Sequence, residues 1–155
     1  MRLLRCFAVI VVLAMPALVG GQAWGQDDPR NVIKYRQGVM KSLADHMSAI
    51  GATVKGEVGY WNQIIVHAIA IDGVNRTIPE LFPVGTGPEA GETRARIDIW
   101  QSQDRFMEAA QQLRQEAARL VHAAQGGDPQ AIGAQFVNVG RACGGCHEHF
   151  RAEKK

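Results

Sequence analysis

Residues 128–150 read DPQAIGAQFVNVGRACGGCHEHF. Asp128 is a good helix N-cap, and Pro129 suits the first helical position. The positions that follow recur at three- and four-residue steps, the spacing of one helical face. These positions are Ile132, Phe136, Val139, Cys143, Cys146, His147 and Phe150. The stretch therefore predicts a helix whose apolar face must be covered by other elements.

Three further helices are predicted upstream of this one. Asp28 is also followed by a proline, and helical spacing of apolar residues continues from there to Gly51. Similar patterns run over residues 60–77 and 94–124, and two glycines follow the last of them. Residues 79–91 hold three prolines and three glycines, which is typical of a crossover loop. The sequence therefore predicts an all-α fold, an antiparallel four-helix bundle.

Composition narrows the classes of partner. The 155 residues are 46% hydrophobic and 21% charged, as in an ordinary globular domain. Of the 17 basic residues, Arg2 and Arg5 lie in a predicted leader. The remaining chain therefore has 15 basic and 15 acidic residues and no net charge. A neutral domain lacks the basic excess that nucleic-acid binding requires. We expect one domain over residues 26–155, with no nucleic-acid partner and no stable membrane association.

The first 25 residues have the pattern of a cleaved signal peptide. A positive start is followed by an apolar run over residues 7–19, and Ala23-Trp24-Gly25 places small residues before the expected cut. No adjacent arginine pair is present, so the general secretory route is favoured over the twin-arginine route. An uncleaved membrane anchor is the alternative. Cleavage would remove Cys6 and leave two cysteines in the exported chain.

Those two cysteines form a C-x-x-C-H motif, Cys143 to His147, which is the attachment signature of c-type haem. On a helix the three side chains share one face, so two thiols and one imidazole meet the same side of a flat ring. Each thiol adds to a haem vinyl group, and His147 becomes the proximal iron ligand. Gly144 and Gly145 weaken the helix, and close approach of the ring is one interpretation of their presence. We predict one covalent haem c.

Other uses of a C-x-x-C pair fit this chain less well. A redox-active pair normally opens a helix after a strand, whereas this motif closes the last helix of a chain without predicted strands. A structural zinc site requires four ligands, and no second Cys or His pair has suitable spacing. A disulfide across such a small loop would stabilise the fold little.

The chain resembles the class II cytochromes c, the family of cytochrome c′ and its low-spin relatives. The similarity rests on CGGCHEHFR at residues 143–151, on KYRQGVM at 34–40, and on the Leu81-Phe82-Pro83 segment followed by Trp100. It covers nearly the whole exported chain. The resemblance implies a periplasmic four-helix bundle with one haem. It also implies electron transfer with redox protein partners, and often a homodimer packed through the first two helices.

The same resemblance suggests roles for individual residues. Met40 matches the position facing the distal side of the iron, where a methionine either coordinates as sixth ligand or covers an open site. Arg36 and Gln37 match positions near the haem and its propionates, and Arg151 matches a basic residue beside His147. Without the resemblance, Met40 would be read as core filling and the two arginines as solvated charges.

These observations predict a non-enzymatic haem protein that carries single electrons, with a slight preference for coordination by Met40. The alternative is a five-coordinate, high-spin cytochrome c′ that binds nitric oxide or carbon monoxide. No distal acid–base pair suggests catalysis. Four other histidines lack partners at ligand spacing and are expected mostly at the surface: His46, His67, His122 and His149.

Overall fold

The computed structural model describes residues 27–153. The predicted signal peptide, residues 1–25, lies outside the described residues, and so does its cleavage site. Within 27–153 no helix is long and apolar enough to cross a membrane.

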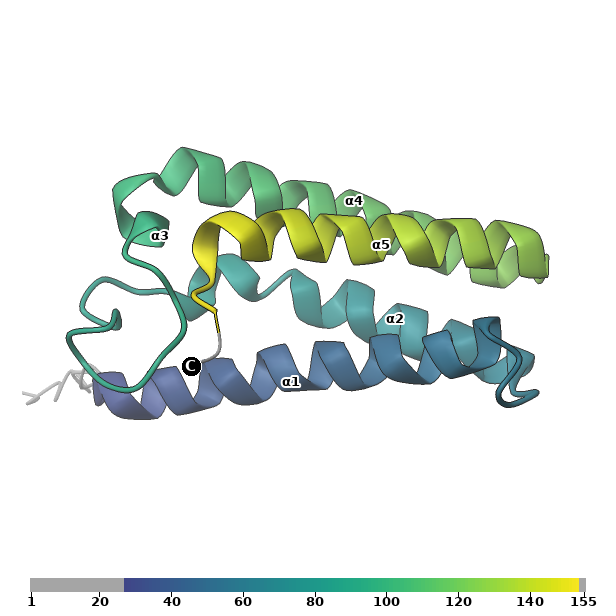
Figure 1. The fold of residues 1–155 in the computed structure, drawn as a ribbon, viewed down its shortest axis with the longest axis horizontal. Helices are drawn as coiled ribbons and strands as arrows, with labels where there is room; N and C mark the ends of the chain where they lie inside the picture. The colour runs from purple at the N-terminus through teal and green to yellow at the C-terminus, as the bar shows by residue number, and fades with distance from the viewer. Residues whose placement is uncertain (1–26, 154–155) are drawn as a thin grey trace, which may run out of the picture.

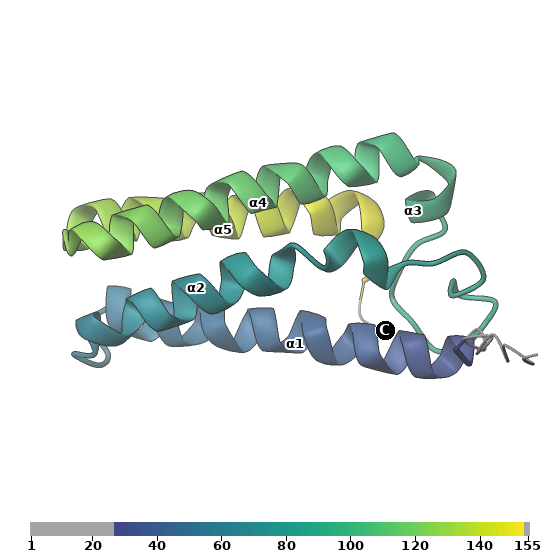
Figure 2. The same ribbon diagram turned by 180° about the vertical axis from the view of Figure 1, so that it is seen from behind.

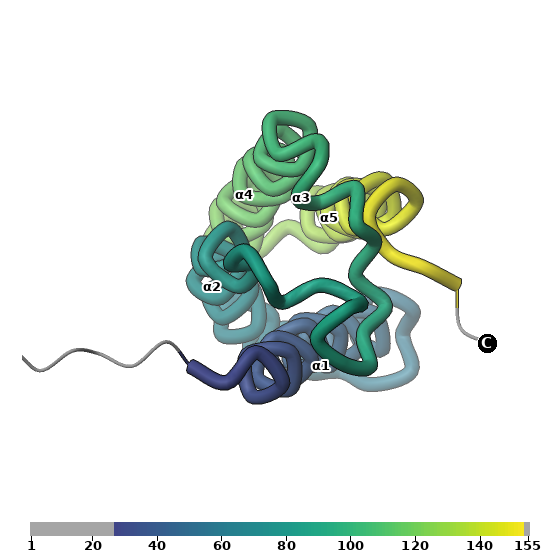
Figure 3. The backbone as a smooth tube through the Cα atoms, turned by 90° about the vertical axis from the view of Figure 1, so that its left-hand side faces the viewer, coloured from purple at the N-terminus to yellow at the C-terminus, as the bar shows by residue number. Residues whose placement is uncertain are grey.

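Four long helices run side by side and alternate in direction (Figures 1 and 2). They are α1 (Pro29–Val54), α2 (Ile64–Asn75), α4 (Gln103–Gly126) and α5 (Pro129–Phe150). Each packs against its neighbour in the ring, and α1 closes the ring against α5. The end-on view in Figure 3 shows them around a common axis, with the segment between α2 and α4 crossing one end. The predicted antiparallel four-helix bundle is confirmed.

Three short helices lie in the connections. These are η1 (Trp61–Gln63), η2 (Ile78–Leu81) and α3 (Asp98–Gln101). The β-type pairing found among residues 27–153 is a single isolated bridge between Ala95 and Arg151.

The two Asp-Pro signals start helices as predicted. The Asp28 carboxylate accepts a hydrogen bond from the Arg30 backbone N–H at 2.9 Å, and that of Asp128 accepts one from Gln130 at 3.0 Å. In both helices the proline follows the cap directly. Each cap satisfies one of the N–H groups that a helix start leaves without a partner.

The predicted end of the first helix at Gly51 is wrong. α1 continues through Gly51 to Val54. A Cβ atom at Gly51 would lie 3.1 Å from Cζ of Phe136 on α5, so this glycine lets two helices pack closely. The real turn follows at Gly56, whose φ of 76° lies in the left-handed region.

The predicted helix over 94–124 is also wrong in its first part. Residues 94–97 are not helical. The helical conformation is then interrupted at Ser102, between α3 and α4, where φ is −128° and ψ is 53°. The helix then runs to Gly126, and Gly127 caps it at φ 71°. The helix predicted over 60–77 is shorter as well, since only Ile64–Asn75 is α-helical.

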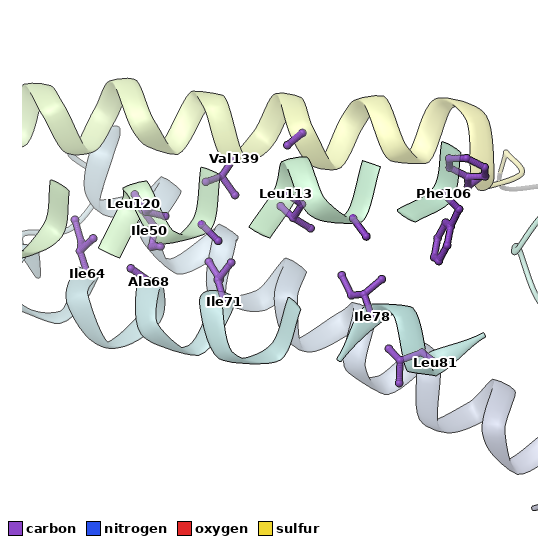
Figure 4. Close-up of a cluster of buried hydrophobic side chains, with 14 of the residues drawn as sticks. Ile50, Ile64, Ala68, Ile71, Ile78, Leu81, Phe106, Leu113, Leu120 and Val139 are labelled. Atoms are coloured by element: carbon purple, nitrogen blue, oxygen red, sulfur yellow. The ribbon is translucent and has the colours of Figure 1, made fainter. Parts of the chain in front are cut away.

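One apolar cluster runs along the bundle axis (Figure 4). Its largest fully buried side chains are Ile50, Ile64, Ile71, Leu120 and Val139. Several apolar residues packed against this cluster are only partly buried. Among them Met40, Leu43, Met47, Cys143 and Cys146 line a cavity.

Candidate functional site

The cavity has a volume of about 620 Å³. This is within the roughly 300–1,000 Å³ typical of small-molecule and cofactor sites. Most of its lining comes from α1, α4, α5 and the segment before α3, and α2, η2 and α3 contribute Ile71, Ile78 and Ile99. It brings together all seven residues that the sequence singled out as site residues, which are Arg36, Gln37, Met40, Cys143, Cys146, His147 and Arg151.

The wall formed by α5 carries the C-x-x-C-H motif. Cys143, Cys146 and His147 are half-buried, and both thiols are free. Burial raises the pKa of Cys143, and it raises the pKa of Cys146 to about 11, so both sulfurs are protonated at neutral pH. Burial also lowers the pKa of His147, with the positive charges of Arg151 and Arg94 acting in the same direction. A neutral imidazole keeps the free lone pair that binds a metal ion.

The wall formed by α1 combines an apolar stretch with the polar side chains of Arg36, Gln37 and Lys41. Met40 is half-buried and lines the cavity together with Leu43, Ala44 and Met47. Met40 also packs against the core cluster. The structure therefore places this thioether in the cavity that the C-x-x-C-H motif lines, as the resemblance implied, and leaves open whether it binds iron.

Arg36 is buried, with 3% of its surface exposed, so its interpretation as a solvated charge is wrong. Its guanidinium donates to the Leu81 carbonyl oxygen at 3.3 Å and to the Thr86 carbonyl oxygen at 3.0 Å. It also donates to the hydroxyls of Thr86 and Thr93, at 3.2 and 3.0 Å. Arg36 thus ties α1 to the irregular segment that crosses the end of the bundle.

Aromatic rings complete the environment of this guanidinium. Arg36 Cζ lies 4.6 Å from the ring centroid of Phe82 and 5.9 Å from that of Trp100. Trp100 Nε1 in turn donates to the Phe82 carbonyl oxygen at 3.0 Å. Burial lowers the pKa of Arg36. The described acceptors of Arg36 are all neutral, and a buried cation without a carboxylate partner favours a negative group nearby.

Gln37 and Arg151 are exposed at the cavity edge. Gln37 Nε2 donates to the Glu92 carbonyl oxygen at 2.9 Å, a second tie between α1 and the crossing segment. Arg151 follows α5 in extended conformation and forms the bridge with Ala95.

Backbone hydrogen bonds fasten the chain after α5 to the segment before α3. Arg96 N–H donates to the Phe150 carbonyl oxygen at 3.0 Å, and Ala152 N–H donates to that of Arg94 at 2.8 Å. The Arg94 side chain also donates to the Ala152 carbonyl oxygen at 2.8 Å. Arg94, Ala95 and Arg151 of this clasp line the cavity together with His147. Nothing in the sequence predicted it, because the two segments are far apart in the chain and carry no strand pattern.

Gly144 and Gly145 face away from the cavity. Both are exposed, and an added Cβ would meet no atom within 4 Å. On a helix they project away from the side shared by Cys143, Cys146 and His147. No contact among the described residues therefore requires glycine at either position.

The histidines outside the motif divide into two groups. His122 and His149 are exposed, as expected. His46 and His67 are half-buried and contact each other across α1 and α2, so the expectation that they lack partners is wrong for this pair. Neither lines the cavity.

The cavity fits a covalently bound haem. Two thiols and a neutral imidazole share one wall, and the other walls are mostly apolar, as a dry macrocycle site requires. Four of the described lining residues are basic, and none is Asp or Glu, which suits the two carboxylates of haem. The basic residues are Arg36, Lys41, Arg94 and Arg151. A helical bundle with this site has the features of a c-type cytochrome.

Comparison with known proteins leads to the same class. The model of one family, described as Cytochrome C', matches residues 31–151. A cytochrome c′ from Rhodospirillum rubrum is 34% identical over 145 residues, which cover 94% of this chain and 98% of that protein. The chain therefore belongs to the cytochrome c′ family.

Two solved structures share the fold. A nitric oxide complex of a mutant cytochrome c′ from Alcaligenes xylosoxidans aligns with a TM-score of 0.76 and 28% identity, covering 83% of this chain and 99% of that one. A carbon monoxide-bound variant from the same source aligns with a TM-score of 0.73 and 28% identity, covering 81% and 97%. The family carries covalent haem c, and Cys143 and Cys146 are the two cysteines that fit its attachment. The roles of single side chains stay predictions.

Proposed function

We propose that this chain is a periplasmic, five-coordinate haem protein that binds a diatomic gas, nitric oxide or carbon monoxide. His147 holds the iron on one side, and Met40 covers the other side without binding it. The observation that carries this proposal is the apolar part of the α1 wall, formed by Met40, Leu43 and Met47. The related proteins solved with nitric oxide and with carbon monoxide support the same ligands.

The apolar wall suits a small neutral gas. Such a ligand gives up little hydration on entering, and it needs no charged group to hold it. The polarity and steric access of the distal side decide which chemistry a haem protein supports. Haem, when bound, supplies the iron that takes the gas. Met40 restricts access through bulk, and its unbranched side chain can move aside.

We further propose that the protein has no turnover of its own. An enzyme acting on a haem ligand needs a group that moves protons near the distal side. Among the described residues that line the cavity, none is Asp or Glu, and His147 is the single histidine. That imidazole is assigned to the iron, so none is left for acid–base chemistry.

Export to the periplasm by the general secretory route is part of the proposal. Its support is the signal-peptide pattern of residues 1–25 together with membership of the cytochrome c′ family. Any electron exchange by the haem would then take place with redox protein partners in the periplasm.

A homodimer packed through α1 and α2 is proposed as well. Both helices carry large apolar side chains that are exposed: Tyr35 at 67%, Val66 at 63% and Ile69 at 54%. Val66 and Ile69 are three residues apart and so share one face of α2. Burying such side chains against a second copy would be favourable.

A second candidate function is single-electron transfer with Met40 as sixth ligand. The position of Met40 in the cavity favours it, since methionine ligation raises the reduction potential. The two functions differ in one property, which is whether the sixth position is open before a gas arrives.

Titration of the ferrous protein with carbon monoxide tests the proposal, with Met40→Ala and Met40→Leu as paired variants. We expect one gas molecule per haem in wild type, faster binding in Met40→Ala, and wild-type-like binding in Met40→Leu, which keeps the apolar bulk. Rapid binding in both variants against very slow binding in wild type would instead show that the Met40 sulfur occupies the iron.

A further inference from the structure

His46 on α1 and His67 on α2 face each other across the helix pair. Their Nδ1 atoms lie 2.9 Å apart, and the ring centroids are 5.2 Å apart with the planes tilted by 53°. Both rings are half-buried, so each keeps some contact with solvent. Neither lines the haem cavity. The pair is therefore a separate cluster, with no part in the gas site proposed above.

The contact restricts the protonation of both rings. Two Nδ1–H groups cannot point at each other at 2.9 Å, so at most one Nδ1 carries a hydrogen and the other presents a lone pair. Burial, and then the nearby His46, lower the pKa of His67, which favours its neutral form. Neutral imidazole is the form that binds metal ions.

We propose that His46 and His67 form a chelating site for a divalent transition-metal ion, with Cu²⁺ preferred. Metal–nitrogen bonds of roughly 2.0–2.1 Å put two ligands at a right angle roughly 2.9 Å apart, and two tetrahedral ligands roughly 3.3–3.4 Å apart. The observed separation of 2.9 Å is that of a hydrogen bond and is equal to the right-angle separation, so the two nitrogens need not move apart to hold a metal in that geometry. Cu²⁺ and Ni²⁺ favour that geometry with nitrogen ligands, and Cu²⁺ binds more tightly than Ni²⁺ or Zn²⁺.

In the metal-free protein the same two atoms share a hydrogen bond. Metal binding requires the ring with Nδ1–H to move that hydrogen to Nε2, a change of tautomer that releases no proton from the neutral pair. Both Nδ1 atoms then carry a lone pair, and the rings must turn from the hydrogen-bonded direction so that the two lone pairs converge on one metal ion. Each Nε2 stays free to bond with water.

The two rings are the protein ligands of the proposed site, since within residues 27–153 no group of three or more His, Cys, Asp or Glu side chains is placed to hold a metal ion. Both rings are half-buried and keep some contact with solvent, so water would fill the remaining positions. Since the two ligands come from different helices, the metal would link α1 to α2 and stabilise the folded chain over the unfolded one.

Calorimetric titration of the oxidised, haem-loaded, chelator-treated protein with Cu²⁺, Ni²⁺ and Zn²⁺ tests this site. The oxidised state keeps Cu²⁺ from taking an electron from the haem. We expect one tight site per chain, with Cu²⁺ bound most tightly. His46→Gln and His67→Gln should each weaken Cu²⁺ binding by roughly tenfold or more, since loss of even an outer-shell partner costs about 10–100-fold.

His122→Gln is the matched control, because this histidine is exposed and distant in sequence from both. It should leave Cu²⁺ binding unchanged. Electron paramagnetic resonance of the Cu²⁺-loaded wild type should show two imidazole nitrogens, and this readout needs no variant to fold. Equal loss in His122→Gln, undiminished binding in either of the paired variants, or a signal from fewer than two imidazoles would overturn the proposal. An unchanged haem spectrum throughout separates this test from the fate of the gas site.

Discussion

Arg36 is buried in the structure, although its place in the sequence suggested a charge exposed to solvent. Its neighbours in α1 gave no sign that a guanidinium would be buried, yet 3% of its surface is exposed and its described acceptors are all neutral. The side chain holds the crossing segment through Leu81, Thr86 and Thr93. Its charge also faces the cavity, where the haem carboxylates would be placed.

Replacing Arg36 with leucine should lower the free energy of unfolding by roughly 2–3 kcal/mol, because it removes hydrogen bonds from a charged donor and leaves buried oxygens without partners. Arg36→Lys should recover only part of the loss, since an ammonium lacks the planar fork. Denaturant unfolding of the haem-loaded protein measures both. Arg105→Leu, at an exposed position of α4, is the control and should change stability little. Equal losses at positions 36 and 105 would contradict the role assigned to Arg36.

His67 makes stability depend on pH. Burial and His46 lower the pKa of His67 in the folded chain, whereas in the unfolded chain it is near the usual 6.5. As pH falls through about 6.5, the unfolded chain takes up a proton that the folded chain resists. In the presence of a chelator, the free energy of unfolding should therefore decrease from pH 7 to pH 5. His67→Gln should show a smaller decrease, and an identical decrease would place the sensitive group elsewhere.

At the scale of elements, the starts of helices were predictable and several ends were not. Asp28 and Asp128 cap their helices through local hydrogen bonds, which a sequence pattern can reveal. Gly51 resembled the end of a helix, but it lies inside α1, where the lack of a Cβ leaves room for Phe136 on another helix. Residues 94–96 are held in a non-helical conformation by hydrogen bonds to Phe150 and Ala152, which lie far along the chain. Contacts between distant segments decide both cases.

In the candidate site, too, some residues could be predicted from the sequence and others could not. Cys143, Cys146 and His147 share one short helical face, so their common place on the cavity wall was predictable from spacing. Met40 was singled out by the family resemblance, since its apolar stripe alone indicates core filling. The buried arginine, the chain-end clasp and the histidine pair were not predictable. Each joins segments at least 21 residues apart, as the His46–His67 contact shows, and no periodicity within one helix signals it.

Alanine substitutions should distinguish a helical glycine with open space around it, such as Gly145, from one that packs against another helix, such as Gly51. Gly145→Ala should raise the free energy of unfolding by roughly 0.5–1 kcal/mol, because the position is open and alanine favours a helix. Gly51→Ala should gain less, since its Cβ would press on the Phe136 ring at 3.1 Å. Thermal unfolding of the haem-loaded variants compares them. A loss of haem incorporation in Gly145→Ala would show that this position does face the ring.

At the scale of the whole molecule, the exposed apolar side chains of α2 predict self-association. Wild type should have the mass of a dimer in analytical ultracentrifugation. Ile69→Glu should shift it toward monomer, because a charge would be buried in the interface. Val137→Glu places the same charge at a similarly exposed position of α5 and should leave the dimer intact. A monomeric wild type, or equal effects of both variants, would contradict packing through the first two helices.

The spin state of the haem-loaded wild-type protein tests the central claim most directly. His147, whose pKa is lowered by burial, lies on one wall of the cavity, and Met40 lies on another. If Met40 does not bind the iron, we expect a high-spin ferric spectrum without a far-red sulfur-to-iron band, and a high-spin ferrous protein. A low-spin ferric spectrum with that band, converted to high-spin by Met40→Ala, would contradict the claim that Met40 does not bind the iron and make the chain a methionine-ligated electron carrier.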